Sequence, residues 1–136
     1  MTKDYITYEE GYEYQVKVDC ELMTPIKGFH AAMDFLELFP DGRLVLYKGF
    51  AWDGSSGVAD TKSSQRASAG HDALFRLLRA NLIPHDPCFH LSNVFYYEQC
   101  IKDGMWKWRA KLRLNGLEKL GNAHAKVQPD PAFIAP

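Results

Sequence analysis

A short polar segment is the first place in this sequence where chemistry is expected. Residues 52–57 read Trp-Asp-Gly-Ser-Ser-Gly, which places one carboxylate, two hydroxyls and two glycines close together. Backbone N–H groups and the side chains of Asp53, Ser55 and Ser56 could converge on a small ligand there, with Trp52 beside them. The alternative is an Asx-turn, in which Asp53 accepts hydrogen bonds from nearby backbone N–H groups while Trp52 fills the core. The residue types leave both interpretations open.

A histidine followed directly by an aspartate forms the second candidate. His71 and Asp72 fall on a predicted helix, where adjacent side chains point about 100° apart and share a ligand only at the edge of a cleft. In a catalytic site His71 would act as general base, with Asp53 and Asp72 orienting it. The alternative is a core histidine on the apolar stripe of the helix, with Asp72 paired to Arg76 one turn later. A Ser/His/Asp triad is disfavoured, because an adjacent aspartate cannot easily reach the far ring nitrogen.

The side chains of His71, Asp72 and Asp53 could also hold a divalent metal ion. Mixed nitrogen and oxygen ligands suit several divalent ions. The histidines show neither an H-x-x-x-H nor an H-E-x-x-H spacing, however. A metal cofactor is therefore the less favoured hypothesis for this site.

The segment Lys102–Lys119 interleaves basic residues with Trp106 and Trp108. Such a pattern can bind nucleic acid through phosphate contacts and base stacking. The alternative is a helix whose charged face is solvated while both tryptophans pack inward. The formal net charge of the chain is −1, which favours the alternative, so nucleic acid is not the expected partner.

Composition indicates one globular domain spanning residues 1–136, since 46% of the residues are hydrophobic and 24% charged. The three cysteines show no C-x-x-C spacing, which favours a reducing compartment. No signal peptide or membrane-spanning run is expected. The predicted location is the cytoplasm.

Strands are predicted over about residues 11–50. Alternation predicts one half-buried strand over Tyr12–Met23, with an inward face of Tyr12, Tyr14, Val16, Val18 and Cys20. A second strand over Phe29–Phe39 would reach Arg43–Phe50 through the turn Pro40-Asp41-Gly42. A helix over Ala31–Phe39 is the alternative. The loop that follows, residues 51–66, is long enough to suggest a functional role.

Helices are predicted over about residues 65–120, followed by an irregular tail over 122–136. Ser63 or Ser64 would cap the first, over 65–79, whose apolar stripe is Ala67, His71, Leu74, Phe75 and Leu78. Asp86 would cap the second, which stops near Gly104 and turns inward Leu91, Val94, Phe95 and Ile101. The third would span 105–120, with a break near Asn115-Gly116. These elements predict an α+β fold, a small antiparallel sheet in the N-terminal half packed against three α-helices in the C-terminal half.

Two motifs of this chain resemble a known family. Residues 49–56 fit the pattern G-F-x-x-D-x-x-S, and residues 71–75 fit H-D-x-L-[YF]. Together they resemble a small phage- and prophage-encoded domain family of unknown function, over about residues 43–121. The resemblance implies that Asp53, His71 and Asp72 form one polar cluster, with Asn93 as a further candidate ligand-binding residue. This chain carries Asn93 where the family usually has an aspartate, so one charge of the family's site is missing.

The resemblance implies a phage or prophage accessory protein, located in the cytoplasm of the host cell, with the virion as the alternative. The favoured hypothesis is a binding or host-interaction module whose partner is a host or phage protein, because no complete catalytic motif is present. The alternative is a small hydrolase-like enzyme, metal-dependent or not, that uses His71 with Asp53 and Asp72. Exposure discriminates between the two. An open pocket at His71 favours the enzyme, and a buried, fully paired cluster favours the binding module.

Overall fold

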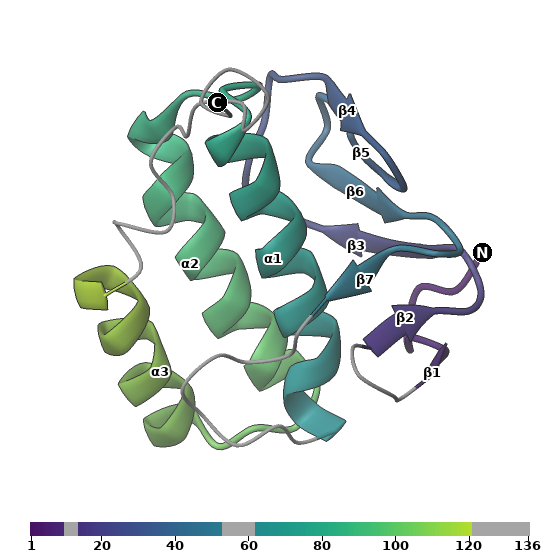
Figure 1. Cartoon of the computed structure of the whole chain (residues 1–136). Helices are drawn as coiled ribbons and strands as arrows, with labels where there is room; N and C mark the ends of the chain where they lie inside the picture. Colours follow the sequence, from purple (N-terminus) through teal and green to yellow (C-terminus); the bar gives the residue numbers. More distant parts are fainter. Residues whose placement is uncertain (10–13, 53–61, 121–136) are drawn as a thin grey trace, which may run out of the picture.

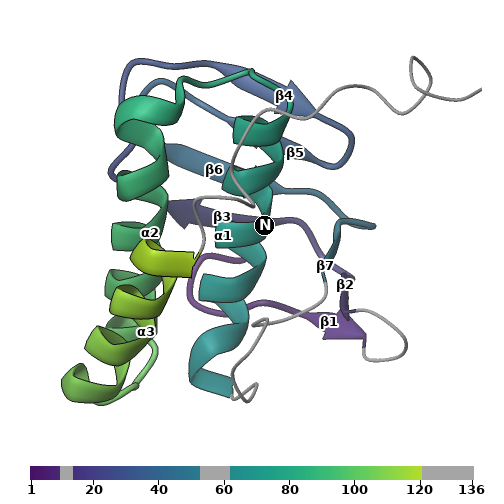
Figure 2. The same cartoon turned by 60° about the vertical axis from the view of Figure 1, so that its left-hand side comes forward.

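The computed structural model describes residues 1–9, 14–52 and 62–120 of the chain. Small antiparallel sheets form in the N-terminal half and three helices in the C-terminal half (Figure 1). The predicted α+β class is therefore confirmed. The helices lie against one face of the larger sheet, as the two views in Figures 1 and 2 show.

The larger sheet has four strands in the order β3-β6-β5-β4, all paired antiparallel. The strands are β3 (Cys20–Met23), β4 (Ala31–Met33), β5 (Leu36–Leu38) and β6 (Arg43–Leu46). Alternate residues point at the helices and are at most 7% exposed, namely Cys20, Leu22, Ala31, Leu36, Leu38, Leu44 and Leu46. This period of two gives the sheet its apolar inner face.

The turn between β5 and β6 lies where the sequence predicts it. The Phe39 N–H donates to the Arg43 carbonyl oxygen at 2.8 Å, and the Gly42 N–H donates to the Phe39 carbonyl oxygen at 2.9 Å. Gly42 takes a φ of 93°, a conformation that glycine adopts without strain. The Asp41 carboxylate accepts a hydrogen bond from the Arg43 N–H at 3.0 Å, so the side chain supports the turn.

The prediction of one strand over Phe29–Phe39 is wrong, and so is the helical alternative. The segment forms a hairpin of its own, β4 paired with β5, and reverses at Phe35, whose φ is 68°. The Phe35 carbonyl oxygen accepts a hydrogen bond from the Tyr47 N–H at 2.9 Å, which fixes this reversal against the end of β6. The even alternation of apolar residues on both sides of the reversal conceals it in the sequence.

The single strand predicted over Tyr12–Met23 is also wrong. The chain bends between β2 (Tyr14–Val16) and β3, which belong to different sheets. Val18, assigned to the inward face, is 42% exposed. The Asp19 carboxylate accepts a hydrogen bond from the Lys48 N–H at 2.7 Å, which holds the bend. Tyr12 lies outside the described residues.

The smaller sheet has three strands in the order β1-β2-β7, with β1 (Tyr8–Glu9) and β7 (Ala51–Trp52) on either side of β2. Its pairing places Tyr14 opposite Trp52. Trp52 is the last residue of β7 and directly precedes Asp53 in the sequence. The smaller sheet therefore carries the start of the predicted functional loop. Only the beginning of that loop, residues 51–52, and its end, from residue 62, fall within the described residues.

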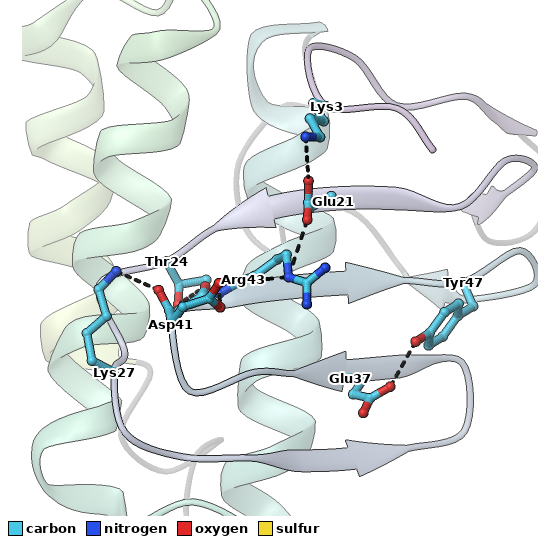
Figure 3. Close-up of polar contacts among 9 residues, drawn as sticks. Lys3, Glu21, Thr24, Lys27, Glu37, Asp41, Arg43 and Tyr47 are labelled. Atoms are coloured by element: carbon cyan, nitrogen blue, oxygen red, sulfur yellow. Dashed lines mark hydrogen bonds and ion pairs between the residues drawn. The ribbon is translucent and has the colours of Figure 1, made fainter.

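The outer face of the larger sheet is polar (Figure 3). Glu21 lies between Lys3 and Arg43, with both nitrogen–oxygen distances at 3.4 Å, and the Tyr47 hydroxyl donates to Glu37 at 2.8 Å. The Arg43 guanidinium also lies 4.2 Å above the centre of the Phe39 ring. Surface ion pairs of this kind contribute little to stability, so this face is mainly a solvated one.

Three helices build the other layer of the molecule. They are α1 (Gln65–Arg79), α2 (His85–Lys102) and α3 (Lys107–Leu120), and a short 3₁₀ turn, η1 (Lys62–Ser64), precedes α1. The bounds of α1 match the prediction, and Ser64 occupies its N-cap position without a side-chain capping hydrogen bond. α1 contacts both the sheet and α2, whereas α3 packs on α2 (Figures 1 and 2). The order of layers is therefore sheet, α1 with α2, and α3.

The bounds of α2 agree with the prediction, and the residues on its inward face agree with it in part. Asp86 keeps an extended backbone, as a capping residue does, and Gly104 ends the helix region with a φ of 103°. Of the four residues predicted to point inward, Phe95 is buried, and Leu91 and Ile101 are half-buried and pack against the core. Val94 is half-buried and does not belong to the core clusters. The buried residues of α2 are Cys88, Ser92, Asn93, Phe95, Tyr96, Gln99 and Cys100. The buried face of α2 includes polar side chains, because hydrogen bonds satisfy Ser92, Asn93 and Gln99.

α3 departs from prediction in two ways. It runs without interruption through Asn115-Gly116, so the predicted break is wrong. Trp106 and Trp108, expected to pack inward, are 72% and 60% exposed. The residues of α3 that are buried instead are Ala110 and Arg113, whose guanidinium donates to the Tyr96 hydroxyl at 3.0 Å. Within the described residues, no helix is both long and apolar enough to cross a membrane.

Candidate functional site

His71 lies in the second turn of α1, on the side that faces α2. Its ring lies between two aromatic rings, with centroids 4.1 Å from Phe75 and 5.6 Å from Tyr96. The side chain is partly buried, and its Nε2 lies 2.8 Å from Oδ1 of Asn93. The predicted placement of His71 on the apolar stripe is therefore confirmed.

Asn93 links His71 to α3. It is fully buried, and its Nδ2 donates to Oε2 of Glu118 at 3.0 Å. The second oxygen of Glu118 accepts a hydrogen bond from Nδ1 of His90. We call His71, Asn93, Glu118 and His90 the interhelical network, because they connect α1, α2 and α3.

The network fixes where the protons lie. A carboxylate can only accept, so the Asn93 amide must turn its NH2 group toward Glu118 and its oxygen toward His71. That oxygen can only accept as well, so Nε2 of His71 carries a proton and donates it. Nδ1 is then the unprotonated nitrogen of a neutral imidazole.

Burial reinforces the neutral form of His71. Desolvation lowers its pKa from 6.5 to about 4, and the hydrogen bond to Asn93 only partly opposes this shift. The imidazole is therefore uncharged near neutral pH. A neutral ring suits a site packed between two aromatic rings, where a charge would lose its hydration.

Asp72 has a separate role. Its carboxylate lies 2.9 Å from the Arg76 guanidinium, which confirms the predicted ion pair one turn apart on α1. The same guanidinium donates to the carbonyl oxygen of Ala51 and lies 4.6 Å above the centre of the Phe50 ring. Asp72 thus helps to hold α1 against β7.

Trp52 belongs to the core. It is 1% exposed and stacks on Tyr14 and Phe50, with ring centroids 5.5 and 6.3 Å apart. Tyr8 meets it edge-on at 6.0 Å. This is the alternative that the sequence left open for Trp52, and it leaves almost none of the ring for a ligand.

The remaining predicted site residues cannot be placed beside His71. Asp53, Ser55 and Ser56 lie outside the described residues, so their approach to His71 stays a prediction. In the described ranges, 1–9, 14–52 and 62–120, no three side chains of the metal-binding types come together to hold an ion. His71 and Asp72, although adjacent, bond to different partners on different elements.

The three cysteines are not activated for chemistry, and a cavity of the molecule lies apart from the interhelical network. All three cysteines are buried and unpaired, and burial raises the pKa of each thiol, that of Cys100 to about 11. Such thiols are poor nucleophiles. A cavity of about 460 Å³ lies between the end of β3 and α2, lined by Thr24, Lys27, Phe95 and Gln99 among others. No residue of the interhelical network lines it.

Sequence reasoning missed Glu118 and its contact with His90. Both follow from the packing of α3 on α2, and Glu118 is 25 residues from Asn93 in the chain. No local spacing signals such a contact. Asn93 was predicted as a ligand-binding residue, whereas in the structure its amide bridges an imidazole and a carboxylate.

Comparisons with protein-family models, curated proteins and solved structures gave no match to this chain. The resemblance to the phage family therefore stays a prediction that rests on the two motifs.

Proposed function

We propose that this chain is a binding module, an accessory protein of a phage or prophage, and that His71 has a structural role in it. The observation that carries the proposal is the bond from His71 to Asn93 within the interhelical network. The residue best suited to catalysis is occupied in joining three helices.

The surroundings of His71 support this role. Two aromatic rings pack against the imidazole, and the only hydrogen on its nitrogens points at a fully buried amide. Removing the imidazole would leave that amide oxygen without a donor, which costs about 1–3 kcal/mol for a buried polar group. Stability alone is therefore a sufficient reason to keep a histidine here.

Asp72 supports the same proposal. It is engaged by Arg76 rather than by His71, so it does not orient the imidazole as a catalytic partner would. Its ion pair stabilises the contact of α1 with β7 through Ala51. The described members of the predicted cluster thus act on two separate contacts.

One observation favours the alternative, a small hydrolase-like enzyme. His71 is neutral, and its Nδ1 holds a lone pair that could accept a proton from water. In that mechanism Asp53 would orient the base or hold a metal ion with Asp72. The alternative needs a substrate to reach Nδ1, which packing against Phe75 and Tyr96 opposes.

The test compares His71→Ala with His30→Ala. His30 is an exposed histidine whose Nε2 lies 2.7 Å from Glu37, on the sheet rather than among the helices. We expect His71→Ala to lower the free energy of unfolding by about 1–3 kcal/mol and His30→Ala to leave it nearly unchanged. Urea denaturation followed by circular dichroism measures both.

The same proteins are assayed for hydrolysis of nucleotides and cell-wall fragments, and for bound metal by elemental analysis. A binding module shows neither activity nor metal. Turnover by the wild type that disappears in a folded His71→Ala variant would overturn the proposal. A stoichiometric metal ion lost in that variant would establish the metal-dependent enzyme instead.

A further inference from the structure

Two tryptophans at the start of α3 stand out on the surface. Trp106 is 72% and Trp108 60% exposed, and Leu112, one turn after Trp108, is 62% exposed. The two indole centroids lie 6.3 Å apart with their planes inclined by 58°. Large aromatic side chains are seldom this exposed without a binding role, because leaving them in water forgoes their burial energy.

Three cations are neighbours of these rings in the chain. Lys107, Arg109 and Lys111 are exposed, and within the part of the chain that the structure describes none of them makes an ion pair. Together with Trp106 and Trp108 they form what we call the α3 surface.

The nearby carboxylates do not neutralise this charge. Asp103 is engaged by the buried guanidinium of Arg66, and Glu118 belongs to the interhelical network. The α3 surface is therefore positive although the net charge of the chain is −1. A ligand at this surface responds to the local charge, since screening limits the influence of distant residues to about 10 Å.

The fold holds the α3 surface outward. α3 rests on α2 through Ala110 and through Arg113, which bonds to the Tyr96 hydroxyl. Both contacts lie on the opposite side of the helix from Trp108. In both views of the molecule α3 lies at the outside, with α2 beside it and the sheet beyond (Figures 1 and 2). Binding there needs no rearrangement of the core.

We propose that the α3 surface binds single-stranded nucleic acid. Bases would stack on Trp106 and Trp108, and phosphates would contact the three cations, which is the combination that proteins use for unpaired strands. The inference rests on the proposed function as a binding module and names its partner class. It replaces the expectation that nucleic acid is not the partner, because that expectation assumed tryptophans packed inward.

Other partners fit the α3 surface less well. Duplex DNA keeps its bases stacked on one another, so the indole rings would have no base face to contact. A membrane surface selects a continuous apolar face, yet the cation Lys107 lies between the two tryptophans. An acidic peptide would meet the cations, but a pair of rings on a convex helix provides no pocket for an anchoring side chain.

The first experiment measures how much the two indole rings contribute to the affinity for an oligonucleotide. Fluorescence anisotropy of labelled 20-nucleotide oligothymidylate and oligouridylate is titrated with the wild type at about 50 mM salt, where phosphate contacts are strongest. We expect the double variant Trp106→Ala/Trp108→Ala to bind at least about 10-fold more weakly. Trp106→Phe/Trp108→Phe keeps a stacking ring at each position and should bind nearly as the wild type does. Phe35→Ala removes an aromatic ring that is 53% exposed on the sheet side and should change nothing.

The second experiment measures how much the cations contribute to the affinity and to its dependence on salt. For a single strand, the affinity falls with salt with a logarithmic slope of about 0.7 per neutralised phosphate, so three cations predict a slope of about 2. Lys107→Glu/Lys111→Glu should lower both the affinity and this slope. Lys48→Glu, an exposed position at the end of β6 on the sheet side, is the matched control and should alter neither.

Three outcomes would overturn the α3 surface as a nucleic-acid site. The first is no binding of either oligonucleotide by the wild type at about 100 µM protein, the weak end of the usual range of non-specific dissociation constants. The second is equal binding by the alanine double variant, and the third is tighter binding to polyglutamate or to anionic vesicles. Circular dichroism melts show that each variant is folded.

The oligonucleotides are also examined on a gel after incubation. Cleavage that depends on His71 would refute the proposed function while leaving the α3 surface intact. Absent binding and absent cleavage would refute the α3 surface alone.

Discussion

The helices α1 and α3 are of similar length, yet they serve opposite purposes. Eleven of the fifteen residues of α1 are buried, among them Arg66 and Ser68. In α3, over residues 107–119, only Ala110 and Arg113 are buried. The buried helix contains polar side chains, and the exposed helix carries tryptophans at its start. Position in the layers therefore decides burial here, and residue type decides it only in part.

The largest expected effect contrasts two tryptophans. Trp52→Ala removes a ring that is 1% exposed and should lower the free energy of unfolding by about 3–5 kcal/mol. Trp106→Ala removes a ring that is 72% exposed and should change it by less than about 0.5 kcal/mol. Urea denaturation followed by far-ultraviolet circular dichroism reports both without relying on tryptophan emission. A similar loss in both variants would mean that Trp106 is buried in solution, and the α3 surface would not exist.

The second expected effect is a dependence of stability on pH that comes from α1. The pKa of His71 is lowered from 6.5 to about 4 in the folded protein by burial. Between these values the unfolded chain binds a proton that the folded protein does not. The free energy of unfolding should therefore be highest above pH 6.5 and fall by up to about 3 kcal/mol as the pH is lowered to 4.

One variant isolates this effect from other groups that titrate in the same range. His71→Gln keeps a donor for Asn93 but does not titrate, so its stability should decline less between pH 6.5 and 4. Parallel curves for the wild type and His71→Gln would show that His71 is solvated.

Much of the fold could be predicted from local patterns. The bounds of α1, its stripe of His71, Leu74 and Leu78, and the turn at Gly42 all arise from interactions within a few residues. Such interactions can be predicted from the spacing of residue types along the sequence. The strand break near Val18 was missed because two short strands in different sheets continue the same alternation.

The site could be predicted only in part, because its contacts are long-range. His71 and the ion pair of Asp72 were identified from helix periodicity. Glu118 was not, because it meets Asn93 only when α3 packs on α2. The exposure of Trp106 was missed for the same reason, since burial of a ring depends on which elements cover it.

The third expected effect concerns Gly70 of α1, which packs closely against α2 and β3. A methyl group on Gly70 would lie 2.5 Å from the ring of Phe95 and 2.9 Å from Leu22. Helix propensity alone favours alanine over glycine, but overpacking a core costs about 1–3 kcal/mol. We expect Gly70→Ala to be destabilising by about that amount. In the double variant Gly70→Ala/Phe95→Leu the cost should be partly relieved, and additivity of the two changes would argue against direct contact.

The smallest expected effect is the same substitution in α3, with the opposite sign. No atom lies within 4 Å of the position that a methyl group on Gly116 would take. Only backbone entropy changes there, so Gly116→Ala should raise the free energy of unfolding by about 0.5–1 kcal/mol. Urea denaturation beside Gly70→Ala makes the pair a direct comparison of the two helices. A neutral or negative effect would mean that α3 is interrupted at Asn115-Gly116, as the sequence predicts, and that the surface bearing Trp106 and Trp108 is carried by a shorter helix.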